Sequence, residues 1–520
     1  MSLRKLGSET MIYGLSNVLG KLLNFVLVTY FISRLMSREE FGVVADLMFW
    51  TGWLIALLVF RMDTALFRFA SRGDYHPGAV FSRLDGLVQR IGLAFLLLGM
   101  VFSKPISTWL GYENQVPYVL LVMLTIFLDV VVAVPLARLR QFERAWFFVA
   151  VNLGNVIVNI FFVFLLLYLL PKYPQLIENY TPWTYRPGHE VGYYLAAVCI
   201  ASLARFLALT IDTYVTFTRP AEEKLPMDFP AILPENVNKV PSWKTIFSYT
   251  APLTLVAVAG IYNAQSGPTM LKELAGTGSM IDNLTYSGLF SAAMKIAIIL
   301  NLFITAYNYA AEPFFFKQTG KDLATADRTI YADACRAYGL IATLASAGIL
   351  LFLPWLSLIV PVEYHSGLVI LPVLLCANLL FGLYANFSIA YKLTDRTWLG
   401  GGIALIGSII IYFINARYAA ELTIWAPAWG MLACYAVMCI LAWFVSRKYF
   451  PVDYPLLRIG LYLLLALGAT MLAARLEGAD NWTIAGADAG AKWYIRGAVF
   501  TLLLAAFGAL EHKWVRRTFF

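Results

Sequence analysis

The chain has 520 residues, of which 60% are hydrophobic and only 13% are charged. Soluble globular proteins carry roughly 45–50% apolar and about 25% charged residues, so this chain lacks the polar surface that a water-soluble globule of its size needs. Its net charge of +8 does not indicate a nucleic-acid-binding protein, because the basic residues lie in short clusters between apolar stretches. The composition predicts an integral membrane protein.

A membrane-spanning helix needs about 20 mostly apolar residues. The sequence therefore predicts an all-α polytopic membrane protein with about 14 transmembrane helices. In chain order, the predicted spans cover residues 10–36, 42–67, 86–109, 116–138, 144–170, 191–216, 246–267, 285–311, 331–354, 366–391, 398–416, 427–446, 457–474 and 493–511. The first stretch is too long for a signal peptide and has no small-residue cleavage site, so we expect it to remain as the first span.

Basic residues between the spans predict the orientation of the chain. With the N-terminus inside, about 24 basic residues lie on the inner side and about 10 on the outer side, as the positive-inside rule requires. An even number of spans then places both termini in the cytoplasm.

The longest inner segment, residues 219–245, is rich in proline and mixed charge, which is typical of an extended linker. We therefore expect an N-terminal six-helix lobe at 1–218, a cytoplasmic linker at 219–245 and a C-terminal six-helix lobe at 246–450. Two additional transmembrane helices and a cytoplasmic tail follow at 451–520. Two six-helix lobes are typical of transporters that rock about a central cavity.

Four basic side chains lie within the apolar stretches: Lys21, Arg61, Arg205 and Lys295. A cation in the hydrocarbon core costs at least a few kcal/mol, so it is normally held by a partner, a water-filled cavity or an anionic ligand. Cations spread over several helices predict a cavity that receives a negatively charged substrate.

Amide side chains accompany the lysine of the first span. Asn17, Lys21 and Asn24 recur at helical spacing and share one face. Such a stripe either joins helices or lines a cavity. Because a lysine joins helices poorly without a carboxylate, we expect the cavity.

The other cations leave alternatives open. Arg61 lies near Asp63, toward the inner end of its span, so it contacts substrate or forms a structural ion pair. Arg205 shares a helical face with Asp212, and both belong to one network or pair with other helices. Lys295 has no acidic residue one turn away in its own helix, which favours a cavity position.

Three acidic residues are candidates for coupling transport to H⁺ or Na⁺. Asp129 lies in the middle of span four, where it is a partner for a cation or carries a proton. Asp212 lies on span six, and Glu312 precedes Pro313 at the inner end of span eight, where a helix cap or a gate is the alternative.

The chain lacks the sequence signatures of a cofactor, a metal or an ATP site. It has no Walker A string, no nucleophile elbow and no HExxH motif, so no cofactor is expected and the protein is predicted not to be an enzyme. Its five cysteines form no CxxC pair and are accompanied by no histidine cluster, which indicates neither a disulfide framework nor a metal site.

Several stretches resemble the Wzx-type oligosaccharide flippases, whose superfamily also holds lipid II flippases and MATE exporters. They are LMSREEFG (35–42), SYTAPLTL (248–255), YSGLFSAAMKIAIILNLFITAYNYAAEPFFFKQ (286–318) and YHSGLVILPVLLCANLLFGLYANFSIAYKLTDRT (364–397). The chain has YNAQSGP where many relatives carry Asp-Arg late in span seven. It also has a single lysine where lipid II flippases carry more arginine on span one, which argues against lipid II as the cargo.

The resemblance implies two six-helix lobes around a cationic cavity to which Lys21, Arg61 and Lys295 contribute. It implies an undecaprenyl-pyrophosphate-linked oligosaccharide as cargo, the bacterial inner membrane as location, and membrane lipids and glycan-assembly enzymes as partners. A membrane-embedded glycan polymerase or ligase, a lipid II flippase and a MATE-like ion-coupled exporter are the alternatives. The short outer loops disfavour the enzyme, and the basic interior disfavours a cation exporter.

Overall fold

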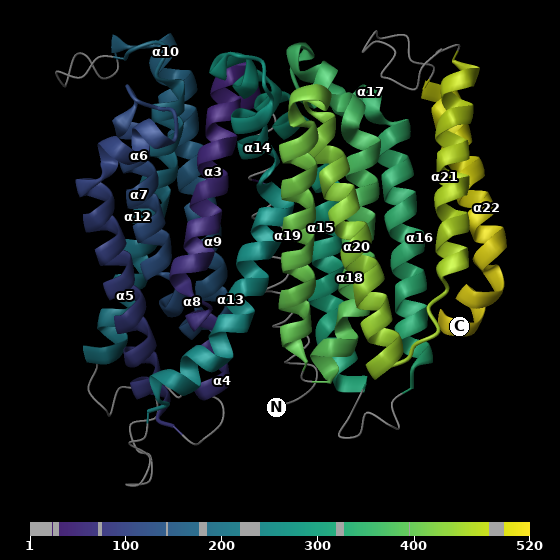
Figure 1. Ribbon diagram of the computed structural model, residues 1–520, viewed down its shortest axis with the longest axis horizontal. Coiled ribbons are helices and arrows are strands. Elements are labelled where there is room, and N and C mark those ends of the chain that lie inside the picture. The colour runs from purple at the N-terminus through teal and green to yellow at the C-terminus, as the bar shows by residue number, and fades with distance from the viewer. Residues whose placement is uncertain are drawn as a thin grey trace. The chain divides into compact units, whose positions relative to one another are not determined.

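The computed structural model describes residues 31–70, 75–141, 144–175, 185–218, 240–318, 327–394, 396–477 and 493–519, together with Leu23. Within these residues the chain is helical and forms no β-strand. It divides into two compact units: residues 43–262 belong to the first unit, and residues 31–42 together with 263–520 belong to the second. The long helices of each unit run side by side (Figure 1).

The first unit holds the helices of the N-terminal half. They are α3 (Arg38–Val59), whose first turn lies in the second unit, α4 (Met62–Ala70), α5 (Pro77–Val101), α6 (Ser103–Trp109), α7 (Val116–Val131), α8 (Ala133–Gln141), α9 (Ala145–Phe164), the π-helical η2 (Leu165–Leu169), α10 (Leu170–Lys172), α12 (Glu190–Thr218) and α13 (Trp243–Gln265), whose last residues lie in the second unit.

The second unit holds the remaining described helices. They are α2 (Ser33–Leu35), α14 (Gly267–Leu274), α15 (Met280–Gln318), α16 (Thr329–Leu351), α17 (Leu353–Leu356), the 3₁₀ segments η4 (Ser357–Ile359) and η5 (Val362–Ile370), α18 (Leu371–Leu393), α19 (Thr397–Leu422), α20 (Trp425–Tyr449), α21 (Leu456–Leu476) and α22 (Trp493–Phe519).

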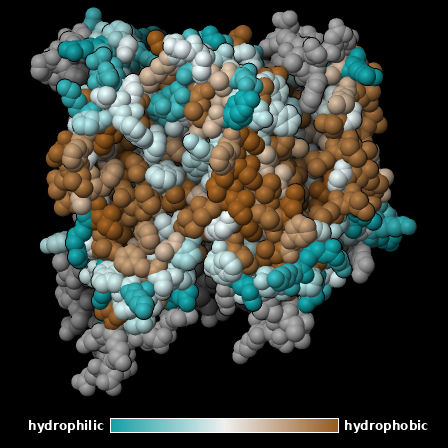
Figure 2. Space-filling view, viewed as in Figure 1, coloured by the Kyte–Doolittle hydropathy of each residue, from teal (hydrophilic) through white to brown (hydrophobic). Residues whose placement is uncertain are grey.

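Within the described residues, 13 helical segments are long and apolar enough to cross a membrane. Apolar residues gather along the middle of the helices, and hydrophilic residues gather at their ends (Figure 2). The predicted all-α polytopic fold is therefore confirmed. The count is consistent with 14, because the first predicted span lies largely outside the described residues.

The third span shows where sequence reasoning was wrong. α5 begins at Pro77, nine residues before the predicted start at residue 86. Its start is fixed locally, since the His76 ring accepts a hydrogen bond from the backbone N–H of Ala79 (3.2 Å) and Pro77 occupies the first helical turn. Arg83 and Asp85, which precede the predicted start of the span, therefore lie within the helix.

In the first unit, α7 packs against both α5 and α12, and α12 packs in turn against α9. A buried cluster centred on Val131, Leu139 and Leu209 joins α7, α8 and α12. The hydroxyl of Tyr112 donates to the carboxylate of buried Asp46 (2.7 Å), which ties α3 to the turn before α7.

α13 is held to the first unit by aromatic contacts. Phe247 lies edge-on to Phe60, with ring centroids 5.5 Å apart, and Tyr249 lies 4.1 Å below the guanidinium of Arg68. α13 thus belongs mainly to the first compact unit, which ends at residue 262. The lobes predicted from the sequence, with their linker at 219–245, stay a prediction.

In the second unit, α18 is the central helix and packs against α15, α16 and α20. Residues 31–42 dock on this unit through backbone acceptors. Arg34 donates to the carbonyls of Leu358 and Ile359 (2.6 Å each), and the hydroxyl of Tyr364 donates to the Met36 carbonyl (3.2 Å). A side chain at Gly288 would collide with the Arg38 carbonyl, so glycine permits this close approach.

The two C-terminal spans, α21 and α22, pack against α16 (Figure 1). At one end of the pair, Arg496 forms a two-pronged ion pair with Glu477 (2.7 and 2.5 Å) and also donates to the Leu351 carbonyl (3.0 Å). At the other end, Glu511 lies among basic residues of α16 and α21, as described below. Ionic contacts at both ends therefore fix α21 and α22 to the second unit.

Candidate functional site

Some predicted site residues lie outside the described residues. These are Asn17, Lys21 and Asn24 of span one. Glu312 lies in α15, but its side chain is not among those described. The roles assigned to these four residues stay predictions.

Arg61 lies at a break in the second span. α3 ends at Val59, α4 begins at Met62, and the two residues between them, Phe60 and Arg61, have φ of 49° and 55°. The left-handed region costs a residue other than glycine about 1–3 kcal/mol, and such strain is common at functional sites. The break therefore places a basic side chain at a strained point of a membrane helix.

The surroundings of Arg61 favour an anionic ligand. Its carbonyl accepts the N–H groups of Thr64 (3.1 Å) and Ala65 (3.0 Å), so Arg61 directly precedes the first turn of α4 and is bonded to it. The start of a helix carries a partial positive charge, which adds to that of the guanidinium. Arg61 is half-buried, and no ion pair joins it to another described residue. Discontinuous helices of this kind point their half-helix N-termini at anionic substrate groups in other transporters.

Arg205 of α12 is paired with Asp129 of α7. One guanidinium nitrogen lies 2.5 Å from a carboxylate oxygen, and each side chain is 18% exposed. Pairing with a charge on another helix was one of the alternatives that the sequence allowed for both residues. The structure shows that they pair with each other. Since the pair is neutral, it offers a cargo less attraction than a lone cation would.

Asp212 is shared between two arginines. It accepts hydrogen bonds from Arg138 of α8 and from Arg144, the latter at 2.6 Å. Arg138 is the last residue of the predicted span 116–138, and the structure buries it at 3% exposure within α8. A buried carboxylate between two guanidinium groups fastens α12 to α8 and to the residue that precedes α9.

Lys295 of α15 forms no ion pair with another described residue of the second unit. Its neighbours Ala293, Ile296 and Ala297 on α15 are buried, while Lys295 itself is half-buried. Among the described residues, none forms a hydrogen bond or an ion pair with its ammonium group. An ammonium without a counter-charge in a membrane helix needs water or an anionic ligand. The cavity position predicted for Lys295 stays a prediction.

Three buried carboxylates were not predicted as site residues: Asp46 on α3, Asp85 on α5 and Glu511 on α22. Asp85 lies one residue before the predicted start of the third span, although Pro77 indicates an earlier helix start. Glu511 of α22 is 2% exposed and contacts Arg336 (2.5 Å), Arg458 (3.2 Å) and the hydroxyl of Tyr462 (2.7 Å). Its partners are distant in sequence, so no local signal reveals them.

The chain was compared with known protein families and structures. The model of a family described as polysaccharide biosynthesis protein matches residues 6–318. No curated protein sequence matches the chain.

Among solved structures, a lipid II flippase MurJ in an inward closed conformation has a TM-score of 0.68 at 11% identity, covering 97% of this chain and 100% of that one. An inward-facing multidrug resistance MATE transporter of the MOP superfamily has a TM-score of 0.61 at 14% identity, covering 87% and 95%. Both likenesses concern the fold.

Proposed function

Because the chain belongs to the polysaccharide biosynthesis protein family, we propose that it is a flippase for an undecaprenyl-pyrophosphate-linked oligosaccharide. It moves this cargo from the cytoplasmic to the outer leaflet of the bacterial inner membrane, by alternating access through a cationic cavity. Both of its termini lie in the cytoplasm, and enzymes that assemble the glycan supply its cargo.

The observation that carries this proposal is that Arg61 in the first unit and Lys295 in the second are half-buried and form no ion pair with another described residue. A pyrophosphate that leaves water loses its hydration and counterions, and charge-assisted hydrogen bonds from basic side chains replace them. The isoprenoid tail needs no such compensation, since it stays in lipid. Lys21, Asn17 and Asn24 contribute to the same cavity in this proposal, and Arg205 is a further contact once it parts from Asp129.

We infer that an ion gradient or the removal of product drives the transport. Of the three coupling candidates, Asp129 and Asp212 are each held by arginine in this conformation. A proton or Na⁺ that reaches either carboxylate competes with a guanidinium, so binding of the ion releases an arginine. Glu312 is the third candidate for coupling.

A translocation assay tests the proposal. Purified protein is reconstituted into vesicles that contain a fluorescent lipid-linked oligosaccharide, and a membrane-impermeant quencher reports the leaflet. Loss of one charge-assisted hydrogen bond to phosphate corresponds to about a tenfold or larger effect, so Lys295→Ala and Arg61→Ala should slow translocation by at least that factor. Arg417→Ala is the control, because Arg417 is exposed and pairs only with Glu421 among the described residues. Wild-type rates for both test variants would contradict the proposal.

The same vesicles separate the alternatives. Growth or transfer of the glycan would identify a polymerase or ligase. Preference for lipid II over the lipid-linked oligosaccharide would identify a lipid II flippase. Lipid II is included as a competing substrate because the fold is similar to that of MurJ. Uptake of organic cations with no lipid movement would identify a MATE-like exporter.

A further inference from the structure

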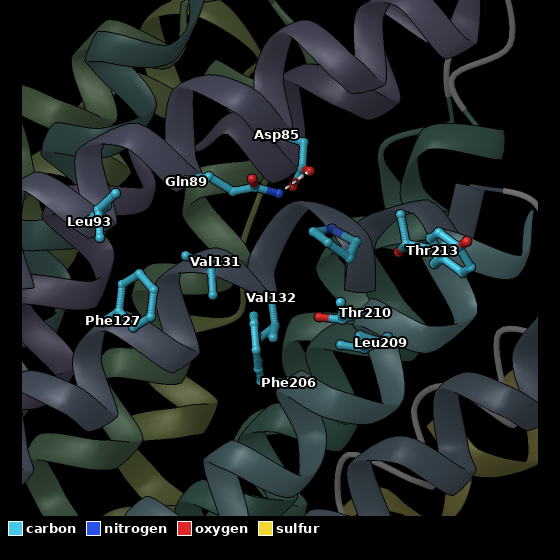
Figure 3. Close-up of a pocket in the computed structure, with 12 residues that line it drawn as sticks. Asp85, Gln89, Leu93, Phe127, Val131, Val132, Phe206, Leu209, Thr210 and Thr213 are labelled. Carbon is cyan, nitrogen blue, oxygen red and sulfur yellow. Dashed lines mark hydrogen bonds between the residues drawn. The ribbon is translucent and has the colours of Figure 1, made fainter. Parts of the chain in front are cut away.

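The first unit contains a groove that has neither Arg61 nor Lys295 among its lining residues. α5 and α12 both pack against α7 but hardly touch each other, so they leave a cavity of about 400 Å³ above α7. Figure 3 shows its walls, with Asp85 and Gln89 from α5, Phe127 and Val131 from α7, and Phe206 from α12. The groove belongs entirely to the first unit.

One end of the groove has unsatisfied hydrogen-bond acceptors. Asp85 is 7% exposed, and one of its carboxylate oxygens accepts a hydrogen bond from the side-chain amide of Gln89 (2.6 Å). The other oxygen has no hydrogen-bond partner among the described residues, and neither has the buried hydroxyl oxygen of Thr213 across the groove. A buried carboxylate oxygen left without a donor costs about 1–3 kcal/mol or more.

Arg138 lies close enough to Asp85 to interact electrostatically, and one of its guanidinium nitrogens donates to Asp212. Among the described residues, no hydrogen bond joins Arg138 to the free oxygen of Asp85. Asp85 therefore offers a site for an additional hydrogen-bond donor that carries a positive charge.

The other end of the groove is apolar. Leu93 lies eight residues beyond Asp85 on α5, which is about 12 Å deeper along the helix. α12 runs antiparallel to α5 along the groove. Phe206, seven residues before Thr213 on α12, therefore lies at a depth similar to that of Leu93. Asp85 is near the beginning of its span and Thr213 is near the end of its own. The groove thus changes from polar at the ends of the helices to apolar toward their middle.

This gradient is that of one leaflet of a bilayer, with polar headgroups at the surface and acyl chains below. We propose that the groove binds a membrane phospholipid with a primary ammonium headgroup. The ammonium donates a hydrogen bond to the free oxygen of Asp85 and to Thr213, and an acyl chain lies over Leu93, Phe127 and Phe206.

The chemistry of the groove excludes other occupants. A soluble cation would leave the apolar walls without a partner, and an anionic headgroup would meet a carboxylate. A trimethylated headgroup carries the charge but has no N–H to donate. The proposal does not rest on the flippase activity.

Lipid binding by the full-length protein tests this proposal. The protein is placed in nanodiscs of matched acyl chains, and bound lipid is counted by native mass spectrometry after competition between phosphatidylethanolamine and phosphatidylcholine. The wild type should retain phosphatidylethanolamine about tenfold or more in preference, the effect of one hydrogen bond to a charged group. Asp85→Asn should abolish the preference, and Glu421→Gln, which changes an exposed carboxylate, should keep it.

A second variant separates the polar end from the apolar end. Leu93→Trp fills the apolar part of the groove, so it should lower the binding of both lipids alike. Equal retention of the two lipids by the wild type would overturn the proposal. So would an undiminished preference in Asp85→Asn, because the headgroup would then bind elsewhere.

Discussion

The two units hold their buried charges differently. In the first unit, several charges within the helices are neutralised by a neighbour: Arg205 pairs with Asp129, and Asp212 contacts two arginines. In the second unit, the buried ion pairs gather where α21 and α22 meet α16, and Lys295 has no described partner. We therefore distinguish two kinds of cation: those that form ion pairs and fasten helices together, and those that have no described counter-charge and are available to a ligand.

Arg61 shows that this distinction is not one between units alone. It lies in the first unit but has no described partner, and it occupies a break between two helices rather than a continuous helix. A cation in a neutral pair has its charge satisfied by the fold, whereas an unpartnered cation is costly until something binds. Removal of paired and unpaired charges should therefore have opposite consequences.

The largest loss of stability is expected at Glu511. Glu511→Ala would leave Arg336 and Arg458 without their shared carboxylate at a site with 2% exposure. Removal of one partner from a buried pair costs about 3–5 kcal/mol. Thermal unfolding in detergent should show a marked fall in Tm, whereas Glu421→Ala at an exposed pair should change stability by less than about 1 kcal/mol. Similar values for the two variants would mean that Glu511 does not fasten α22.

The next effect is expected at the pair in the first unit. Asp129→Ala leaves Arg205 partly buried without its carboxylate, so stability should fall by about 2–4 kcal/mol, somewhat less than at a fully buried pair. Removal of both charges in Asp129→Leu/Arg205→Leu should recover most of the loss, since no lone charge remains. A double variant as unstable as the single one would contradict a role for the pair in stability. The measurement is again the Tm in detergent.

A smaller effect is expected at the helix break. Arg61→Gly and Arg61→Ala both remove the charge, but only glycine adopts a φ of 55° without strain. The glycine variant should therefore be more stable than the alanine variant by about 1 kcal/mol. Both should translocate slowly. If alanine were the more stable of the two, the backbone at Arg61 would not be strained in the protein in solution.

Hydropathy was sufficient to place the spans that the structure describes, because each must supply about 20 apolar residues to cross the membrane. It failed at the start of α5, where Arg83, Asp85 and Arg90 interrupt the apolar pattern inside a helix. The cap at His76 and the proline after it were the signals that carried this boundary, and they are independent of hydropathy.

The pairing of charges could not be predicted from one sequence. Arg205 and Asp129 are 76 residues apart, and Trp514 donates to Asp333 over 181 residues. Helical periodicity tells which residues share a face, but it does not tell which helices meet. For the same reason, the sequence identified Lys295 and Arg61 as exceptional but could not show that Arg205 has a carboxylate beside it.

The smallest change in stability, and the clearest contrast with the paired charges, is expected at Lys295. Lys295→Met keeps the length of the side chain and removes an ammonium that has no described counter-charge, so the Tm should stay the same or rise slightly. Translocation of the lipid-linked oligosaccharide should fall by about tenfold or more, because a hydrogen bond to phosphate is lost, and Lys295→Arg should keep most of the rate. A fall in Tm as large as that of Asp129→Ala would mean that a carboxylate holds Lys295, and would move this residue to the class of cations that fasten helices.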